Sequence, residues 1–251
     1  MALLLSACGN SIGSDIDFKT TSIQREERLT GETNSPACKI DIAVHYVVSK
    51  DSAKALRMNN AIEQKLFDLK GMPMKQAVDS FANQYCHDYK TNMATLYRDD
   101  KADAEKHPWY EYRYALKTDT RNGRNGVTVY LINLDMYEGG AHGIHQQLTM
   151  NFDNKSGKVI TLNDIFVAGY EYPLNEKLLS ALEKKADAKG IDALREKGYL
   201  YSMDIYAPLN YTIDDDHITF IYNVYEIAPY AMGPTELEIL YSDLKDIMKK
   251  E

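Results

Sequence analysis

The chain lacks the features that mark membrane-embedded, nucleic-acid-binding and nucleotide-hydrolysing proteins. No internal run approaches the roughly 18 apolar residues of a membrane span, so nothing after the N-terminus is expected to cross a bilayer. The net charge of −8 opposes binding to nucleic acid and to anionic lipid surfaces. No glycine-rich phosphate loop and no nucleophile-elbow pattern occurs. The sequence therefore predicts no nucleic-acid partner and no cofactor.

Tryptophan and phenylalanine are also scarce, at one and six residues, whereas tyrosine is abundant at 19. Tyrosine combines a flat apolar face with a polar tip, which suits wet recognition surfaces and sugar rings. It is equally favoured half-buried in β-sheets, so the surplus alone does not separate these two interpretations. The 251 residues suffice for one large domain or for two closely packed subdomains.

The N-terminus resembles the end of a bacterial lipoprotein signal peptide. Leu5-Ser6-Ala7-Cys8 matches the lipobox, in which small residues precede a cysteine that accepts lipid. No Lys or Arg precedes the apolar stretch, and a start codon further upstream would explain that departure. We expect residues 1–8 to be a signal remnant that ends at a lipidated Cys8, and two or three acyl chains there would anchor the protein to a membrane.

The polar stretch after Cys8 is typical of a linker. It is rich in Ser, Thr, Gly, Asp and Glu, so residues 9–37 are expected to form a flexible tether. Because no acidic run follows Cys8, we expect a bacterial envelope protein that is held at the outer membrane and faces the periplasm.

Two cysteines remain once Cys8 is lipidated. Cys38 and Cys86 could pair in an oxidising compartment, and the bond would join the first predicted strand to a helix. Sequence does not show whether their Cα atoms come within reach, so the disulfide is one of two open possibilities.

Hydrophobic periodicity predicts an α+β fold, with an antiparallel sheet meander and helices packed on it. Two closely associated subdomains are expected, over residues 38–135 and 136–251. Helices are predicted over 52–69, 73–98, 173–188 and 192–197 and from Ser242 onward, and strands over 39–49, 109–117, 127–136, 145–153, 159–162, 208–213, 217–223 and 236–241.

The most distinctive stretch is the glycine-rich segment 137–145, between two strong strands. Three glycines within five residues require unusual backbone angles or close backbone approach. The segment could be a structural corner or could contact a ligand. A weaker alternative is a metal site at His142 and His145 with Glu138 or Asp135 as third ligand, although the spacing does not match a helical histidine pair.

A second loop, 225–234, follows a strand and is aromatic and punctuated by Pro and Gly. It could line a pocket or form a packed crossover. The acidic run 214–216 lacks the alternating ligands of a calcium loop and is interpreted as a solvated hairpin turn. The predicted ligand-binding residues are Tyr137, Gly139, Gly140, His142, Tyr225 and Tyr230; no catalytic residue is assigned.

Several of these segments together resemble the bacterial "domain of unknown function 3298" family. The resemblance rests on Tyr137-Glu138-Gly139-Gly140-Ala141-His142-Gly143, then Phe152-Asp153 with Ser156-Gly157-Lys158, then Leu162-Asn163-Asp164-Ile165-Phe166 and the late segment 225–233. It covers about Lys39 to the end, with the stretch before Leu131 in the place of the related domain of unknown function 4163.

The resemblance implies an envelope protein. Related domains occur in lysozyme-sensing anti-sigma factors and beside the catalytic domain of some peptidoglycan deacetylases. These 251 residues contain neither a transmembrane helix nor a deacetylase domain, so neither role carries over directly. The leading hypothesis is a non-catalytic, lipid-anchored module that binds a peptidoglycan fragment or a lysozyme-like protein. The alternatives are a metal-dependent hydrolase that uses His142 and His145, and a structural envelope lipoprotein without a small ligand.

Overall fold

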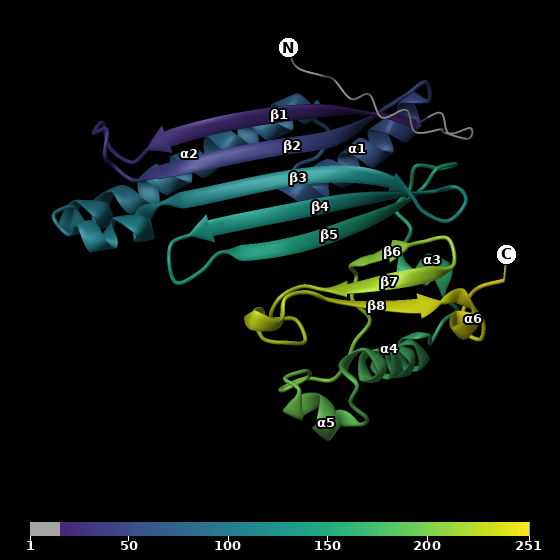
Figure 1. The fold of residues 1–251 in the computed structure, drawn as a ribbon. Helices are drawn as coiled ribbons and strands as arrows, with labels where there is room; N and C mark the ends of the chain where they lie inside the picture. The colour runs from purple at the N-terminus through teal and green to yellow at the C-terminus, as the bar shows by residue number, and fades with distance from the viewer. Residues whose placement is uncertain (1–15, 251) are drawn as a thin grey trace, which may run out of the picture.

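A computed structural model describes residues 16–250, which form two β-sheets with helices packed against each (Figure 1). The larger sheet has the strand order β1-β2-β3-β4-β5, and the smaller has the order β6-β7-β8. No helix within residues 16–250 is long and apolar enough to span a membrane. The predicted lipidation site, Cys8, lies outside the described residues.

The large sheet begins earlier than the sequence predicts. β1 pairs antiparallel with β2 along its whole length, so the flexible tether predicted over 9–37 is wrong from Ile16 onward. The strand escaped detection because it is an edge strand with a mostly polar sequence, and β2 supplies its hydrogen bonds. The strands are β1 (Ile16–Arg28), β2 (Ala37–Ser49), β3 (Tyr112–Asn122), β4 (Val127–Glu138) and β5 (Ile144–Asp153).

The sheet is not a pure meander, because β2 and β3 run parallel. Parallel neighbours need a crossover, and here α1 (Ser52–Phe67), α2 (Met74–Asp100) and the 3-10 helix η1 (Ala104–Tyr110) provide it. The other neighbouring strands pair antiparallel, so the predicted α+β class is confirmed with one parallel step.

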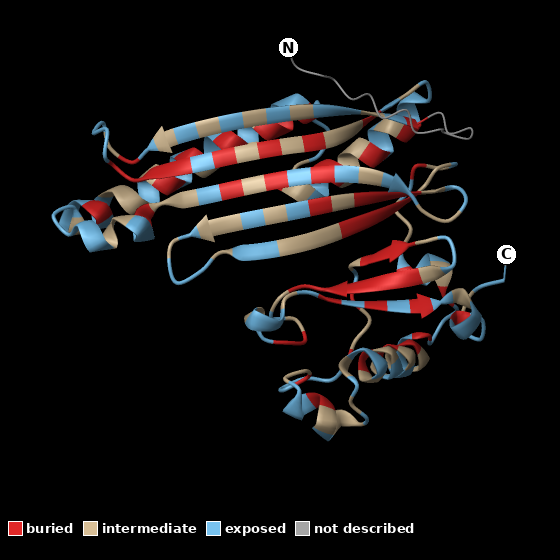
Figure 2. Ribbon diagram, in the orientation of Figure 1, coloured by how far each residue is buried: buried red, intermediate tan, exposed pale blue. Residues whose placement is uncertain are grey.

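The two long helices cover one face of the large sheet (Figure 1). The Asp51 carboxylate caps α1 by accepting the N–H groups of Ala53 and Lys54 at 3.0 Å. Ile42 of β2 and Ile62 of α1 are both fully buried between the helices and the sheet. Figure 2 shows buried and more exposed residues alternating along β2, as a one-sided core requires.

Cys38 on β2 and Cys86 on α2 meet inside this core. Both are free thiols in the structure, and their side chains are hydrogen-bonded to each other. Burial and then the neighbouring Cys86 raise the pKa of the Cys38 thiol. The structure therefore brings the two cysteines together, as the predicted pairing requires, while describing both as free thiols; the disulfide itself stays a prediction.

The small sheet has its own core, with α4 packed beneath it (Figure 1). Leu174, Leu178 and Leu182 recur every four residues on α4 and are all fully buried. The elements are α3 (Leu162–Ile165), α4 (Glu171–Ala186), α5 (Ile191–Glu196), β6 (Tyr211–Ile213), β7 (His217–Tyr222), the 3-10 helix η2 (Tyr230–Met232), β8 (Thr235–Leu240) and α6 (Tyr241–Leu244). The predicted strand over 159–162 is reduced to a single bridge between Phe152 and Val159.

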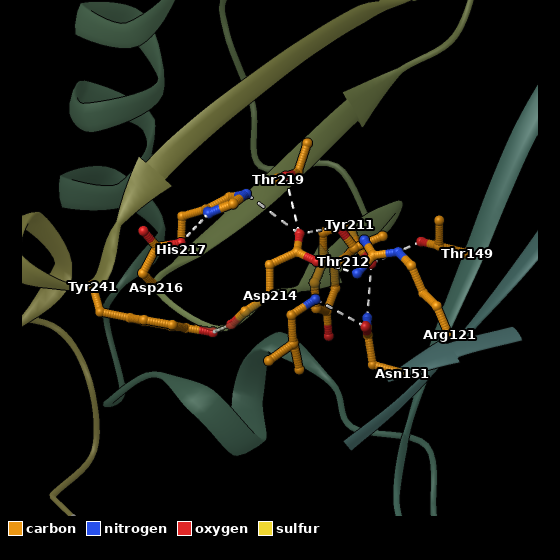
Figure 3. Close-up of polar contacts among 11 residues, drawn as sticks. Arg121, Thr149, Asn151, Tyr211, Thr212, Asp214, Asp216, His217, Thr219 and Tyr241 are labelled. Carbon is orange, nitrogen blue, oxygen red and sulfur yellow. Dashed lines mark hydrogen bonds and ion pairs between the residues drawn. The ribbon is translucent and has the colours of Figure 1, made fainter. Parts of the chain in front are cut away.

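Side-chain amides join the outer edge of β5 to β6. The Asn151 amide nitrogen donates to the Tyr211 carbonyl at 2.7 Å, and its amide oxygen accepts the Ile213 N–H at 3.0 Å (Figure 3). Asn151 therefore imitates a backbone partner between two strands that are not paired directly.

The same edge continues at Gln147. The Asn223 side chain accepts the Gln147 N–H at 2.8 Å and donates to the Gln147 carbonyl at 3.0 Å, while Asn210 donates to that carbonyl at 2.7 Å. We call this row of amide bonds between β5 and the small sheet the seam. Along the chain, the core of the large sheet ends at Val159 and that of the small sheet begins at Ile160, apart from Val127. The predicted subdomain boundary at 135/136 falls inside β4 and is wrong.

Candidate functional site

The glycine-rich segment forms the turn between β4 and β5. Each of its glycines is required there for a different structural reason. Gly139 and Gly140 have φ of +84° and +97°, a region that favours glycine. A Cβ on Gly139 would also lie 2.4 Å from the Trp109 carbonyl oxygen. Gly143 meets the Met136 carbonyl in the same way, at 2.7 Å. Gly139 and Gly143 thus serve close packing, whereas Gly140 has open space around it.

Tyr137 holds this turn in place. Its hydroxyl donates to the Gly140 carbonyl at 3.0 Å and lies 3.4 Å from the Pro108 carbonyl. The side chain is half-buried. Tyr137 therefore shapes the turn from inside, and its predicted ligand contact stays a prediction.

His142, at the exposed tip of this turn, packs against two tyrosines of the β7–β8 connection. Its ring stacks on Tyr230 with 4.2 Å between centroids, and it lies 6.2 Å from the ring of Tyr225. The two tyrosine rings are 5.6 Å apart. We call these three residues the aromatic cluster; it joins the large sheet to the small one.

The hydrogen bonds of His142 define its tautomer. The Gly143 carbonyl can only accept, so Nδ1, at 3.1 Å from it, carries the proton. In the neutral ring Nε2 is then an acceptor, and the Tyr225 hydroxyl donates to it at 3.1 Å. The histidine thereby orients Tyr225.

Tyr225 has an unusual backbone. Its φ of +69° is a conformation that L-residues rarely adopt, and its side chain is 60% exposed. The turn is closed by the Tyr225 N–H, which donates to the Ala228 carbonyl at 3.1 Å, and by the Glu226 carboxylate, which accepts the Asn223 N–H at 2.9 Å. Residues held in such strained conformations cluster at ligand sites, which makes Tyr225 the strongest candidate contact.

A pocket of about 280 Å³ lies beside Tyr225. Tyr201, which is 83% exposed, forms part of its wall together with Met203 and Pro229. Glu226 supplies the carboxylate of this pocket, and burial raises its pKa although the Asn223 N–H partly opposes the shift. The pocket thus combines aromatic faces with a few polar groups, as small-ligand sites do.

His145 is engaged with β4 and not with the aromatic cluster. It lies opposite Asp135 in the β4–β5 register, and its Nδ1 is hydrogen-bonded to the Asp135 carboxylate. Between residues 16 and 250 no group of three or more His, Cys, Asp or Glu side chains could hold a metal ion. The predicted metal site at His142 and His145 is therefore not assembled, because one ring stacks on tyrosines and the other pairs across the sheet.

The acidic run 214–216 is not simply a solvated turn. Asp214 has a side chain only 12% exposed, and it pairs with Arg121 of β3 (Figure 3). The hydroxyls of Thr212 and Thr219 also donate to it, at 2.7 and 3.2 Å. Burial raises the pKa of Asp214, but these bonds outweigh burial and hold the pKa below its usual value. The group is a structural link between the sheets.

Three of the predicted contact residues thus come together: His142, Tyr225 and Tyr230. Gly139 faces the Trp109 backbone instead of open space. Sequence reasoning missed Tyr201, which follows α5 in a segment without any periodic pattern. Its only local signal is the aromatic and apolar stretch over residues 199–206.

The fold and the site together define a class: a two-sheet α+β domain with an exposed aromatic cluster where the sheets meet. The chain belongs to the DUF3298 family, described as "Protein of unknown function", whose family-wide profile matches residues 163–242. A solved member of this family from Bacteroides fragilis is 30% identical, with a TM-score of 0.88 over 94% of this chain and 95% of that chain. A DUF3298 family protein from Pseudomonas aeruginosa shares the fold at 20% identity, with a TM-score of 0.59.

A characterised relative is the peptidoglycan-N-acetylmuramic acid deacetylase PdaC of Bacillus subtilis. It is 30% identical over 117 residues, which are 46% of this chain and 25% of the relative. The match therefore spans about a quarter of the length of that enzyme.

Proposed function

We propose that this protein is a non-catalytic recognition module of the bacterial envelope that binds cell-wall glycan at the aromatic cluster and the adjoining pocket. The observation that carries the proposal is the exposed, strained Tyr225, oriented by His142 beside a small aromatic-walled pocket. Aromatic faces pack against the apolar faces of sugar rings, while the hydroxyl tips and nearby backbone groups bond to sugar hydroxyls.

The size of the pocket agrees with a glycan ligand. Its volume of about 280 Å³ is near the lower end of small-molecule sites, roughly 300 Å³. Such a site suits one sugar ring, and Tyr230 and His142 extend the aromatic surface beyond it. Part of a longer glycan chain could therefore lie along the cluster.

The charges of the pocket favour binding over hydrolysis. Glycoside hydrolysis uses two carboxyl groups on opposite sides of the scissile bond. Among the residues that line this pocket, Glu226 is the only one with a carboxyl group, and that group accepts a backbone N–H. We therefore assign Glu226 to shaping the turn and to accepting sugar hydroxyl groups.

The similarity to a peptidoglycan deacetylase supports an envelope location. Lipidation of Cys8, and attachment to the periplasmic face of the outer membrane, remain parts of this proposal. A mass measurement of the protein purified from membranes would show the acyl chains on Cys8; a protein without them would remove the anchor but leave the glycan site untouched.

Calorimetric titration with muropeptides and with N-acetylglucosamine oligomers tests the glycan site. Tyr225→Ala and Tyr201→Ala should each weaken binding about tenfold, equivalent to about 1.4 kcal/mol. Tyr172→Ala is the matched control, because Tyr172 is a tyrosine of α4 whose exposure lies between those of Tyr225 and Tyr201, and it lines a separate pocket. No binding by the folded wild-type protein, or equal losses in all three variants, would contradict the proposal.

A lysozyme-like protein is the second candidate partner. The net charge of −8 would attract a strongly basic protein electrostatically. Binding of this kind should weaken steeply with salt, whereas stacking on sugar rings should not. Titration with lysozyme at low and high ionic strength separates the two candidates, and absence of both would favour a purely structural envelope role.

A further inference from the structure

The small sheet ends in an unpaired edge. β8 is its last strand. The Tyr241 N–H donates to the Asp216 carbonyl at 3.0 Å, and this bond shows which residues of β8 are hydrogen-bonded to β7. Alternate residues of β8 therefore bond to β7, while Glu236, Glu238 and Leu240 direct their N–H and C=O groups away from it. No described residue hydrogen-bonds to these outward groups, so the edge can accept another strand.

A groove of about 560 Å³ runs between this edge and α4. On the helix side its wall includes the small residues Ser180 and Ala181 and the exposed ring of Tyr172. On the strand side Ile239, which shares the buried face of β8 with Leu237, lines the groove, together with Glu238 and Leu240 from the exposed face of the strand. The groove thus offers apolar surface between charged side chains, next to a row of free backbone groups, which is the arrangement that captures extended peptides by strand addition.

The charges along the strand side are all acidic. Glu236 and Glu238 are exposed and make no ion pair with any residue between 16 and 250, and Asp243 follows just beyond the strand. On the helix side Lys177 is already paired with Asp246 at 3.0 Å, which leaves Lys184 as the other cation. The edge itself therefore favours basic residues in whatever lies beside it.

The same charges disfavour a second copy of this chain. An antiparallel β8–β8 pairing that used all three outward residues would place Glu238 of one copy opposite Glu238 of the other. Like charges directly opposite are destabilising, and charges on an edge strand are a common defence against self-association.

We propose that the free edge of β8 binds an extended segment of a partner protein in which apolar and basic residues alternate. The segment adds to the small sheet as a fourth strand. Its apolar side chains enter the groove over Ser180 and Ala181, and its basic side chains lie on the opposite face beside Glu236 and Glu238. This partner site is separate from the aromatic cluster, so the two can be tested independently.

The probe is a fluorescein-labelled hexapeptide of alternating valine and lysine, acetylated and amidated at its ends. Fluorescence anisotropy should report saturable binding to the full chain. Two matched peptides serve as controls: one with the three lysines and three valines in separate blocks, and one with N-methyl groups that remove alternate N–H donors. Both should bind at least about tenfold more weakly, because one loses the alternation and the other loses the ladder.

Two variants connect the binding to this groove. Glu238→Lys should weaken binding of the valine-lysine peptide at least about tenfold and should strengthen binding of a valine-glutamate peptide. Ser180→Trp fills the groove at an exposed position and should weaken both peptides. Tyr225→Ala, in the aromatic cluster, should leave peptide binding unchanged; circular dichroism confirms that each variant is folded.

Equal binding of the blocked or N-methylated peptide would overturn the proposal, because binding would then follow net charge alone. So would unchanged binding in both Glu238→Lys and Ser180→Trp. A dimer in sedimentation experiments that disappears in Ser180→Trp would also overturn it, since the edge would then belong to a second copy.

Discussion

Asn151 offers a direct measurement of what joins the two sheets. It is 2% exposed, and its amide forms two hydrogen bonds to β6, to the Tyr211 carbonyl and from the Ile213 N–H. Asn151→Leu keeps the size of the side chain but removes both bonds. The Tyr211 carbonyl retains the Thr149 hydroxyl at 2.7 Å, whereas the Ile213 N–H loses its acceptor.

The expected cost follows from these contacts. Two lost hydrogen bonds are worth about 1 kcal/mol each, and a buried donor without an acceptor costs about 1–3 kcal/mol more. Burial of the leucine offsets part of this, by about 1 kcal/mol, so we expect a loss of about 3 kcal/mol in the free energy of unfolding. Thr149→Val should cost only about 1 kcal/mol, because it leaves no donor stranded.

Urea unfolding followed by circular dichroism measures these differences. Asn133→Leu is the matched control, since Asn133 is an exposed asparagine on β4 and its replacement should change stability by less than about 0.5 kcal/mol. If Asn151→Leu costs no more than Thr149→Val, the amide does not substitute for backbone pairing and the reasoning fails.

Two further predictions concern Asp214 and the glycine turn. Because the pKa of Asp214 is lowered in the folded protein, its carboxylate stabilises the fold above the usual aspartate pKa, and this stabilisation is lost as pH falls through the folded value. The difference in urea midpoint between wild type and Asp214→Asn should therefore be larger at about pH 7 than at about pH 3. A constant difference would refute this. Gly139→Ala should cost about 3 kcal/mol in urea unfolding and Gly140→Ala about 1 kcal/mol, since both pay for a positive φ but only Gly139 faces a carbonyl at 2.4 Å; equal costs would show that the contact with Trp109 is unimportant.

Local patterns predicted most of the elements. The helices predicted over 52–69 and 73–98 correspond to α1 and α2, because four-residue periodicity and a capping aspartate are local signals. β1 carries no such signal. It buries only Ile16, and its strand conformation depends on pairing with β2.

Contacts between distant residues were beyond the reach of these patterns. The sequence singled out His142 and Tyr225, but nothing local shows that residues 83 positions apart share a hydrogen bond. The Arg121–Asp214 pair is separated by 93 positions, so the acidic run looked like a solvated turn. The parallel pairing of β2 with β3 is likewise decided by how α1 and α2 pack on the sheet.

The aromatic cluster is divided between the two sheets, so the proposed site depends on the contacts that hold the sheets together. His142 comes from the β4–β5 turn, whereas Tyr225 and Tyr230 come from the β7–β8 connection. Asn223, which bonds to Gln147 of β5, also donates its N–H to Glu226 beside Tyr225. The same asparagine therefore fastens the sheets and closes the turn that presents Tyr225. For this reason neither sheet alone carries the proposed glycan site, and the two subdomains form one binding unit.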